Sequence, residues 1–370
     1  MPKIKLKAKV IIVKKVLTDE KIEKLEGEFF DERSSKKIIK EDCDVYRLDN
    51  NGKKILLAKF RKNVFPEDKI TCGFKSFSKL AKPARGRGPS AGPIDPKSVY
   101  WKKRKVSQCK SKWMTYQIKE DGTKSKMQVS NPVISTAIGF TESNGLANLP
   151  CRLTHFTRTN FDTYKNGIPF IQEIDACYKT LIPDCYRKQK SRANKRKDLK
   201  IKDTAFSTIT VNRNFRTAMH KDSGDFKEGF GNLSVIERGK YSGGYTIFPQ
   251  YSVGFDVRNG DFLAMDVHEW HANTPIYQTP NQKKYNEKLE DIFKDNPDVG
   301  TSGTEFKFTR LTFVCYLRQN LVHCSDKIDP QYLTSGDGTK IVPKKRYSNV
   351  KPMKVAVSSR RKTQKKINKK

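Results

Sequence analysis

Residues 309–317 read Thr-Arg-Leu-Thr-Phe-Val-Cys-Tyr-Leu and alternate cleanly between two faces. Successive side chains of a β-strand point to opposite sides of a sheet, so the even-numbered positions from Arg310 to Tyr316 share one face. The odd-numbered positions, from Leu311 to Leu317, are apolar and form the other face. This stretch predicts a strand that covers an apolar core with one face and carries mainly polar side chains on the other.

Strands of this kind recur from residue 208 onwards. Short β-like segments alternate with turns that contain Gly, Pro and Asn, and together they predict a β-sandwich or jelly roll. The segments lie at residues 208–212, 233–237, 245–248, 253–257 and 261–267. A polar segment at residues 278–305 interrupts the series, and we expect it to be a surface insertion with a short helix at residues 281–294.

The first 200 residues predict a mixture of strands and helices. Residues 3–10 alternate Lys with apolar residues, as a half-exposed strand does, and Thr18 is placed to cap a short helix. Asn51-Gly52 predicts the turn of a hairpin over residues 45–60. Apolar residues at helical spacing over residues 170–181 predict an amphipathic helix. The fold class is therefore α+β, with helices flanking a β-core.

Composition divides the chain into three parts. We expect a basic N-terminal α/β extension over residues 1–130 that packs on the core or contributes to it. The core follows over residues 131–325, and a basic tail over residues 326–370 is expected to be disordered.

The charge of the chain is extreme, with 75 Lys and Arg against 40 Asp and Glu and a formal net charge of +35. Such a charge attracts polyanions and releases their counterions, so nucleic acid is the expected partner. An anionic membrane surface is the rival, but no long amphipathic helix supports it, and no run is apolar and long enough to span a bilayer. We therefore expect an intracellular protein, with a monomer favoured, in the nucleus or another DNA-containing compartment.

The eight cysteines are scattered and include no C-x-x-C pair. In a chain without a secretion signal, this distribution predicts reduced thiols rather than a disulfide framework or a zinc site.

A metal-ligand pattern lies within the β-rich part. His220 and Asp222 are two residues apart, so both can reach one metal ion from a strand, and a distant histidine could complete the set. Two imidazoles and one carboxylate on one face of the metal are the ligands of non-haem iron(II) oxygenases. His268 and His271 both qualify as the third ligand, and spacing alone does not separate them.

Arg310 and Thr312 offer a carboxylate site on the polar face of the strand with which we began. A guanidinium and a hydroxyl can bind a carboxylate through bidentate and single hydrogen bonds. In oxygenases of this kind, a downstream arginine on an apolar strand anchors the far carboxylate of 2-oxoglutarate.

The ordered set of these residues resembles the TET/J-binding-protein group of DNA-base dioxygenases. The residues that carry the resemblance are His220-x-Asp222, Gly243-Gly244-Tyr245-x-x-Phe248-Pro249, Gly260-Asp261, His268-x-x-His271-x-Asn273-Thr274 and Arg310-x-Thr312. The likeness is densest over residues 205–320 and extends more loosely over residues 56–182. It implies a double-stranded β-helix (jelly-roll) oxygenase core that uses Fe(II), 2-oxoglutarate and O₂.

The resemblance also implies roles for single residues. It favours His271 over His268, so that His220, Asp222 and His271 bind iron, while Arg310 and Thr312 bind 2-oxoglutarate. Arg152 is expected on the cosubstrate side. Enzymes of this group oxidise the 5-methyl group of thymine or 5-methylcytosine. The chain shows no counterpart of the TET cysteine-rich zinc region or of a base-J-reading domain, which favours thymine.

A methyl group inside a duplex is out of reach of a buried iron, so the nucleotide must be flipped out or supplied single-stranded. Phosphate contacts can offset the cost of unstacking. The Pro/Gly/Arg-rich loop at residues 82–93, which we do not expect to be regular structure, and the basic run at residues 187–200 are the candidate DNA contacts. The residues expected to bind nucleic acid are Arg85, Arg87, Arg192, Lys195 and Arg196.

Three other functions compete with a thymine hydroxylase. The chain could oxidise 5-methylcytosine, or it could be a 2-oxoglutarate oxygenase of protein side chains or alkylated bases. It could also be a non-catalytic DNA-binding protein, but such a protein has no reason to keep a set of iron ligands.

Overall fold

The computed structural model describes residues 2–49, 51–79, 83–104, 111–143, 150–290 and 307–325. The basic tail expected over residues 326–370 lies outside these residues, as do residues 291–305 of the predicted insertion. Within the described residues, no helix is long and apolar enough to cross a membrane.

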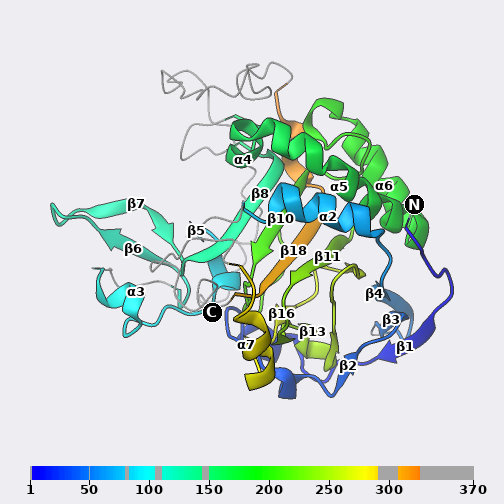
Figure 1. The fold of residues 1–370 in the computed structure, drawn as a ribbon, viewed down its shortest axis with the longest axis horizontal. Helices are drawn as coiled ribbons and strands as arrows, with labels where there is room; N and C mark the ends of the chain where they lie inside the picture. The colour runs from blue at the N-terminus through cyan, green and yellow to red at the C-terminus, as the bar shows by residue number, and fades with distance from the viewer. Residues whose placement is uncertain are drawn as a thin grey trace, which may run out of the picture.

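The centre of the fold is a ten-stranded, mostly antiparallel sheet (Figure 1). In spatial order its path is β1 (Lys9–Val13), β3 (Cys43–Leu48), β4 (Lys54–Arg61), β15 (Phe262–Met265), β11 (Gly231–Arg238), β18 (Thr309–Tyr316), β10 (Thr208–Arg213), β8 (Val133–Thr141) and β5 (Pro83–Ala84), with β9 (Arg152–Leu153) paired to β8. The alternating stretch from which the prediction began is thus a central strand, as its two-faced pattern requires.

Helices cover one face of this sheet (Figure 1). They are α2 (Glu67–Phe77), α4 (His155–Thr159), α5 (Phe161–Leu181) and α6 (Pro183–Asn194). The odd-numbered residues Leu311, Phe313 and Cys315 are fully buried in the apolar core beneath the helices. The predicted helix ending near Pro183 is confirmed, although α5 begins nine residues earlier than the apolar repeat indicates.

The opposite face of the large sheet packs on a four-stranded sheet. Its strands are β16 (Ala272–Asn273), β13 (Thr246–Phe248), β14 (Val253–Phe255) and β2 (Lys37–Ile39). A second core lies between the two sheets, where residues such as Leu233 and Val235 meet Phe248 and Phe255. The α+β class is confirmed, and each β-segment predicted between residues 208 and 317 contains a strand.

The N-terminal region contributes to both sheets. The predicted hairpin is confirmed as β3 and β4, and Thr18 caps α1 (Asp19–Glu23) as expected. The strand expected at residues 3–10 begins only at Lys9, because its lysine-rich first half pairs with no neighbouring strand. The loop at residues 82–93 does contain regular structure, namely β5 and a 3-10 turn over Gly88–Ala91.

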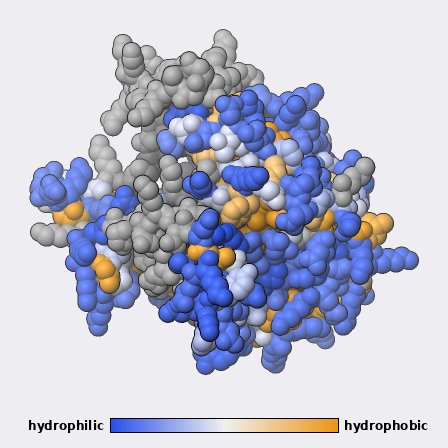
Figure 2. Space-filling model, viewed as in Figure 1, coloured by the Kyte–Doolittle hydropathy of each residue, from blue (hydrophilic) through white to orange (hydrophobic). Residues whose placement is uncertain are grey.

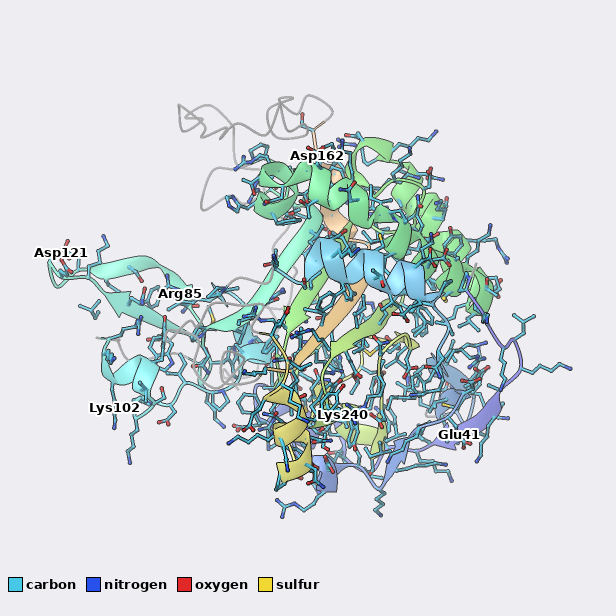
Figure 3. The ribbon with its side chains drawn as sticks, in the orientation of Figure 1. Glu41, Arg85, Lys102, Asp121, Asp162 and Lys240 are labelled. Carbon is cyan, nitrogen blue, oxygen red and sulfur yellow. A yellow bond between two sulfur atoms is a disulfide. The ribbon has the colours of Figure 1, made fainter. Side chains whose placement is uncertain are left out.

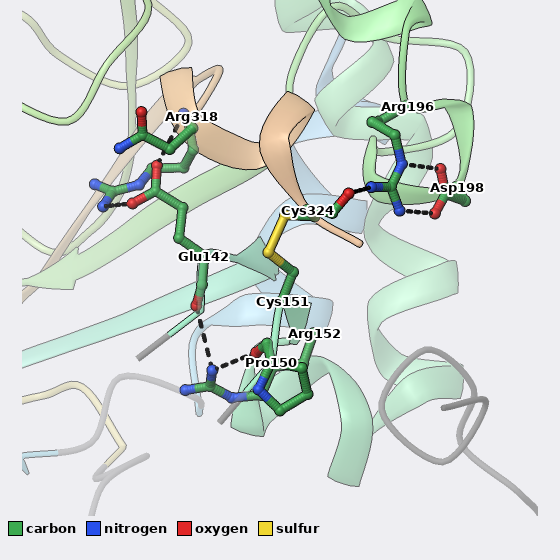
Figure 4. Close-up of a disulfide and its surroundings, with 9 residues drawn as sticks. Glu142, Pro150, Cys151, Arg152, Arg196, Asp198, Arg318 and Cys324 are labelled. Atoms are coloured by element: carbon green, nitrogen blue, oxygen red, sulfur yellow. Dashed lines mark hydrogen bonds and ion pairs between the residues drawn. A yellow bond between two sulfur atoms is a disulfide. The ribbon is translucent and has the colours of Figure 1, made fainter. Parts of the chain in front are cut away.

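The prediction of reduced thiols is wrong for one pair, because Cys151 and Cys324 form a disulfide (Figure 4). The two cysteines are 173 residues apart in the sequence, and only the pairing of β9 with β8 and the course of the chain after β18 bring them together. Among the described residues, five cysteines remain free.

Candidate metal centre

Backbone hydrogen bonds bring His220, Asp222 and His271 together. His220 and His271 form an isolated antiparallel bridge, in which each backbone N–H donates to the carbonyl of the other at 3.0 and 3.1 Å. The Asp222 N–H donates to the Val267 carbonyl at 3.0 Å, which ties this residue to the segment after β15. His220 and Asp222 therefore do not lie in the continuous strand that we predicted. An isolated bridge and a single backbone hydrogen bond hold them in place instead.

The imidazoles are oriented by their own backbone. His220 Nδ1 lies 2.8 Å from the Ala218 carbonyl, and His271 Nδ1 lies 3.0 Å from the Glu269 carbonyl. A carbonyl only accepts, so both Nδ1 atoms carry the proton and both Nε2 atoms keep a free lone pair. These Nε2 atoms lie 3.6 and 4.0 Å from the carboxylate oxygens of Asp222.

The three ligand atoms lie within 4.8 Å of one another, as a shared metal ion requires. Burial, together with the neighbouring His271, lowers the pKa of His220 to about 4, so that its imidazole is neutral near pH 7 and can act as a ligand. Two histidines and one carboxylate on one side of a cavity suit Fe(II) with open positions opposite.

His268 does not join this cluster. Its Nε2 lies 3.3 Å from the Phe226 carbonyl, and its backbone N–H donates to Asp266 Oδ1 at 3.1 Å. Of the two histidines that spacing left open, the structure brings only His271 to His220 and Asp222.

The cluster opens into a cavity of about 860 Å³ between the two sheets. The large sheet contributes the inner faces of β10 and β18, including Thr210, Asn212, Thr312 and Tyr316. The remaining walls come from α1, from the loop that follows β5, from the turn after Asp222, from β16 and from the residues after β18. They include Glu23, Arg87, Ser90, Asp225, Asn273 and Arg318.

Arg310 is a buried cation that stands opposite Glu237 of β11 and lacks some of its hydrogen bonds. Burial raises the pKa of the Glu237 carboxyl, and the charge of Arg310 opposes that rise. The Arg310 side chain lies on the same face of β18 as Thr312, is 2% exposed, and has no hydrogen-bond partner for Nε or Nη2 among the described residues. Burial of a guanidinium whose N–H groups are partly unsatisfied is costly unless a ligand accepts the missing hydrogen bonds. Arg310 is not itself among the residues that line the cavity, but its strand neighbour Thr312 is.

The Gly243-Gly244 pair lies beside this guanidinium in a backbone conformation that favours glycine. Both glycines have positive φ angles, of 72° and 70°, which glycine adopts without strain. A Cβ atom on Gly243 would collide with the Pro275 carbonyl, and one on Gly244 would lie 3.4 Å from Arg310 Nε. The motif is thus a backbone requirement beside the predicted cosubstrate arginine.

From the sequence we expected Arg87 to lie on an outer surface that binds DNA. In the structure it lines the cavity instead. It is half-buried, and its Nη2 donates to Ser135 Oγ, which in turn donates to Asn212 Oδ1 at 2.6 Å. Burial lowers the pKa of its guanidinium. A basic loop looks solvated in sequence, and only the pairing of β5 with β8 turns this arginine inwards.

The structure does not bring Arg152 to the cavity. Its guanidinium donates to the carbonyls of Glu142 and Pro150 at 3.2 and 2.9 Å, beside the disulfide (Figure 4). Arg196 is also not on a free surface: it is 8% exposed and bonded to Asp198 and to the Cys324 carbonyl. Figure 4 shows both arginines in these structural positions.

The other expected DNA contacts are more accessible. Lys195 is exposed near the end of α6, and Arg192 is half-buried with a long 3.4 Å hydrogen bond to the Gln319 carbonyl. Arg85 is exposed and lies two residues before Arg87. These three residues do not converge on the metal cluster.

Sequence reasoning missed two buried or half-buried charged residues in the cavity wall, Asp225 and Arg318. Asp225 is 6% exposed, and burial, followed by the charge of Asp222, raises the pKa of its carboxyl well above the ordinary value. Arg318, which forms a backbone bridge with Asp225, pairs with Glu142 at 3.0 Å. Nothing in the local sequence distinguishes Asp225 from the other acidic residues of a turn.

Comparison with known proteins adds to this geometry. Residues 135–319 match the Tet/JBP family model, described as the oxygenase domain of the 2OGFeDO superfamily. The chain is 38% identical over 128 residues to thymine dioxygenase JBP1 of Trypanosoma brucei brucei, which covers 35% of this chain and 15% of that protein. It is 34% identical over 172 residues to the bifunctional helicase and thymine dioxygenase JBP2 of Leishmania tarentolae, an alignment that covers 46% of this chain and 13% of that protein.

These alignments span about one seventh of the relatives' own length. A solved structure of NgTET1 in complex with 5mC DNA aligns with a TM-score of 0.42 and 11% identity, covering 78% of this chain and 82% of that one.

Proposed function

The chain belongs to the Tet/JBP oxygenases of the 2-oxoglutarate- and Fe(II)-dependent dioxygenase superfamily, and on this basis we propose that it hydroxylates the 5-methyl group of thymine in DNA. The family match covers residues 135–319, half of the 370-residue chain. Fe(II) is accordingly the cofactor, and 2-oxoglutarate and O₂ are the cosubstrates. Thymine is proposed because the aligned relatives are thymine dioxygenases.

In this proposal His220, Asp222 and His271 hold the iron. The observation that carries the proposal is their convergence, within 4.8 Å, at the wall of a cavity whose lining residue Thr312 shares a strand face with Arg310, a buried arginine with two nitrogen atoms that have no hydrogen-bond partner among the described residues. Bound iron supplies the chemistry that inserts one atom of O₂ into a C–H bond while 2-oxoglutarate becomes succinate and CO₂. The carbonyls of Ala218 and Glu269 hold the imidazole protons on Nδ1 and so keep both Nε2 atoms directed at the metal.

Arg310 and Thr312 are proposed to bind the far carboxylate of 2-oxoglutarate. The carboxylate would supply the two charge-assisted hydrogen bonds that Nε and Nη2 lack. Arg87 is a second cation in the cavity, and we propose that it faces the reactants rather than the DNA backbone. Arg152 has no part in the proposed site.

The finer features of the fold and setting are proposed on the same basis. The two facing sheets are proposed to be the double-stranded β-helix of this superfamily, with the core at residues 131–325 and the preceding residues as an extension. The partner is proposed to be DNA, with the target nucleotide flipped or single-stranded, and the location to be the nucleus or another DNA-containing compartment. The net charge of +35 supports this polyanionic partner.

Incubation with Fe(II), 2-oxoglutarate, ascorbate and thymine-containing DNA tests the proposal. Nucleoside mass spectrometry should detect 5-hydroxymethyluridine, with a matching yield of succinate. In a parallel incubation with DNA that also contains 5-methylcytosine, a product restricted to 5-hydroxymethylcytosine would make 5-methylcytosine the substrate in place of thymine. DNA binding without succinate would indicate a non-catalytic protein.

The histidines provide a matched pair of variants for this assay. His271→Ala should lose bound iron and lower turnover by at least about 10²-fold, because one of three ligands is removed, while DNA affinity stays close to that of the wild type. His268→Ala should retain both iron and turnover. The reverse pattern would mean that the metal ligands are assigned wrongly.

A further inference from the structure

One part of the structure projects from the body and has no role in the proposed reaction. The described residues 92–104 and 111–131, called here the arm, lie between the cavity loop and β8 (Figure 1). Their described elements are α3 (Val99–Lys102) and a separate hairpin of β6 (Thr115–Ile118) and β7 (Lys124–Val129). Among the described strands, these two pair only with each other, and they project away from the large sheet (Figure 3).

The arm is strongly basic. Residues 92–104 and 111–131 contain eight Lys or Arg and three Asp or Glu. Lys97, Lys102, Lys103 and Lys119 are exposed, and within the described residues none of their ammonium groups pairs with a carboxylate. Figure 2 shows this projecting surface as mostly hydrophilic. Free ammonium groups of this density are expensive to hold together unless a polyanion neutralises them.

The root of the arm is fixed to the cavity. Arg85, which precedes the cavity residue Arg87, donates to Gln117 of β6 at 3.2 Å. The Asn131 side chain lies 2.8–3.1 Å from the carbonyls of Ala91, Gly92 and Pro93 and accepts from Trp101 Nε1 at 2.6 Å. The arm is therefore held in a set position beside the cavity loop.

The arm also contacts the acidic wall of the cavity. Lys112 pairs with Glu28 at 2.7 Å, and the Trp113 ring packs against Gly27, just after α1. The α1 residues Asp19 and Glu23 line the cavity, as does Glu26, so phosphates are repelled from this part of the mouth. Cations beside the mouth would offset this repulsion, and the root of the arm lies there, with its exposed lysines further out along the projection (Figure 3).

We propose that the arm grips the phosphodiester backbone of DNA beside the nucleotide that enters the cavity. This inference rests on the proposed function, because the arm is a nucleic-acid surface only if the cavity acts on a nucleic-acid base. Lysine is suited to this contact, since it meets a phosphate as a point charge without sequence preference. The grip offsets the cost of flipping the target nucleotide.

The test removes three arm charges at once. Lys102→Ala, Lys103→Ala and Lys119→Ala are combined in one variant, and the control combines Lys40→Ala, Lys53→Ala and Lys54→Ala. The control lysines are also exposed and lie around β2–β4, on the other side of the molecule (Figure 1). Both variants lose three charges, so a difference between them reports position and not net charge.

Binding to a labelled 30-base-pair duplex is measured by fluorescence anisotropy between about 50 and 300 mM salt. Each lost phosphate contact lowers the slope of log K against log[salt] by about 0.9, so the arm variant should lose about 2–3 in slope and roughly 10²-fold in affinity at 0.15 M. The control should change slope by less than about 1. Equal losses in both variants would overturn the arm as the grip.

Turnover separates this inference from the proposed function. On a thymine-containing trinucleotide, too short to reach from the cavity along the arm, the arm variant should form product as the wild type does, while its turnover on the long duplex falls. Equal loss on both substrates would overturn the backbone grip in favour of a structural role. The binding measurement needs no turnover, so it decides the role of the arm even if the wild type forms no 5-hydroxymethyluracil.

Discussion

Replacement of Arg310 with methionine should stabilise the ligand-free protein and abolish its response to 2-oxoglutarate. Arg310 is 2% exposed, and its Nε and Nη2 have no partner among the described residues. Replacing a buried, poorly compensated ion with an apolar side chain of similar size stabilises by roughly 1–4 kcal/mol. For 370 residues the entropy of unfolding is about 0.8 kcal/mol/K, so the melting temperature should rise by about 1–5 °C.

The response to 2-oxoglutarate should change in the opposite direction. A ligand present at 100 times its Kd stabilises a protein by about 2.7 kcal/mol, or about 3 °C here. Loss of the charged hydrogen bonds should cost roughly 2–5 kcal/mol of affinity, which is a 30- to several-thousand-fold increase in Kd. At the same concentration, the variant should therefore show almost no thermal shift.

Arg61 provides the matched control, because it is a buried arginine with partners. It is 0% exposed, donates to the carbonyls of Lys5, Cys43 and Phe60, and pairs with Asp44 at 2.8 Å. Arg61→Met leaves Asp44 without this counter-charge, so it should destabilise by roughly 3–5 kcal/mol while the 2-oxoglutarate shift remains.

Differential scanning fluorimetry with Mn²⁺ in place of oxidisable iron measures both effects without turnover. Isothermal titration calorimetry gives the Kd directly. If Arg310→Met lowered the melting temperature as Arg61→Met does, and still responded to 2-oxoglutarate, then Arg310 would be an ordinary structural arginine and the reasoning from its missing partners would fail.

Three further changes test other parts of the structure. In the metal-free protein the raised pKa of Asp225 means that unfolding releases a proton, so the free energy of unfolding should fall as pH rises above about 4. Asp225→Asn should flatten that fall in urea titrations between about pH 5 and 8. An unchanged pH dependence would contradict this prediction. Cys151→Ser opens a loop of 173 residues and should cost about 2–5 kcal/mol, so that a reductant lowers the melting temperature of the wild type only; an equal effect of reductant on the variant would contradict the bridge. Gly243→Ala should destabilise by several kcal/mol, because a positive φ adds to a collision with Pro275, whereas Gly52→Ala, at a similar φ of 75° in open space, should cost only about 1–2 kcal/mol; similar losses would refute the steric argument.

Local periodicity accounts for what the sequence predicted correctly. The alternation around Phe313 and the Asn51-Gly52 turn are properties of neighbouring residues, and both reappear as a central strand and a hairpin. The start of α5 at Phe161 was missed because the residues before Phe170 include Gly167 and Pro169, which disfavour helix. Tertiary packing overrides that preference here.

The candidate site depended on pairing that no local pattern contains. The choice between His268 and His271 rests on a bridge across 51 positions, in which His220 and His271 exchange backbone hydrogen bonds. Spacing within the sequence left both histidines open, and only the resemblance to a family favoured one. The cysteine bridge was missed for the same reason, because residues 173 positions apart meet only after both sheets have formed.

Arginine and lysine behave differently in this fold, which explains why Arg87 and Arg196, two of the expected DNA contacts, do not lie on a free surface. Among the described residues, Arg61, Arg196, Arg213 and Arg310 are buried, whereas no lysine is. A planar guanidinium is weakly hydrated and can satisfy several carbonyls or carboxylates at once, while an ammonium group is strongly hydrated and stays in water. An arginine in a basic loop is therefore weak evidence for a nucleic-acid surface, as the inward course of Arg87 illustrates. The positive charge that is exposed to solvent is therefore carried mainly by lysines. A search for the surface that binds DNA should begin with exposed lysines that have no ion-pair partner and that lie on a fixed element. In this chain the arm carries such a group of lysines, and its root lies beside the cavity.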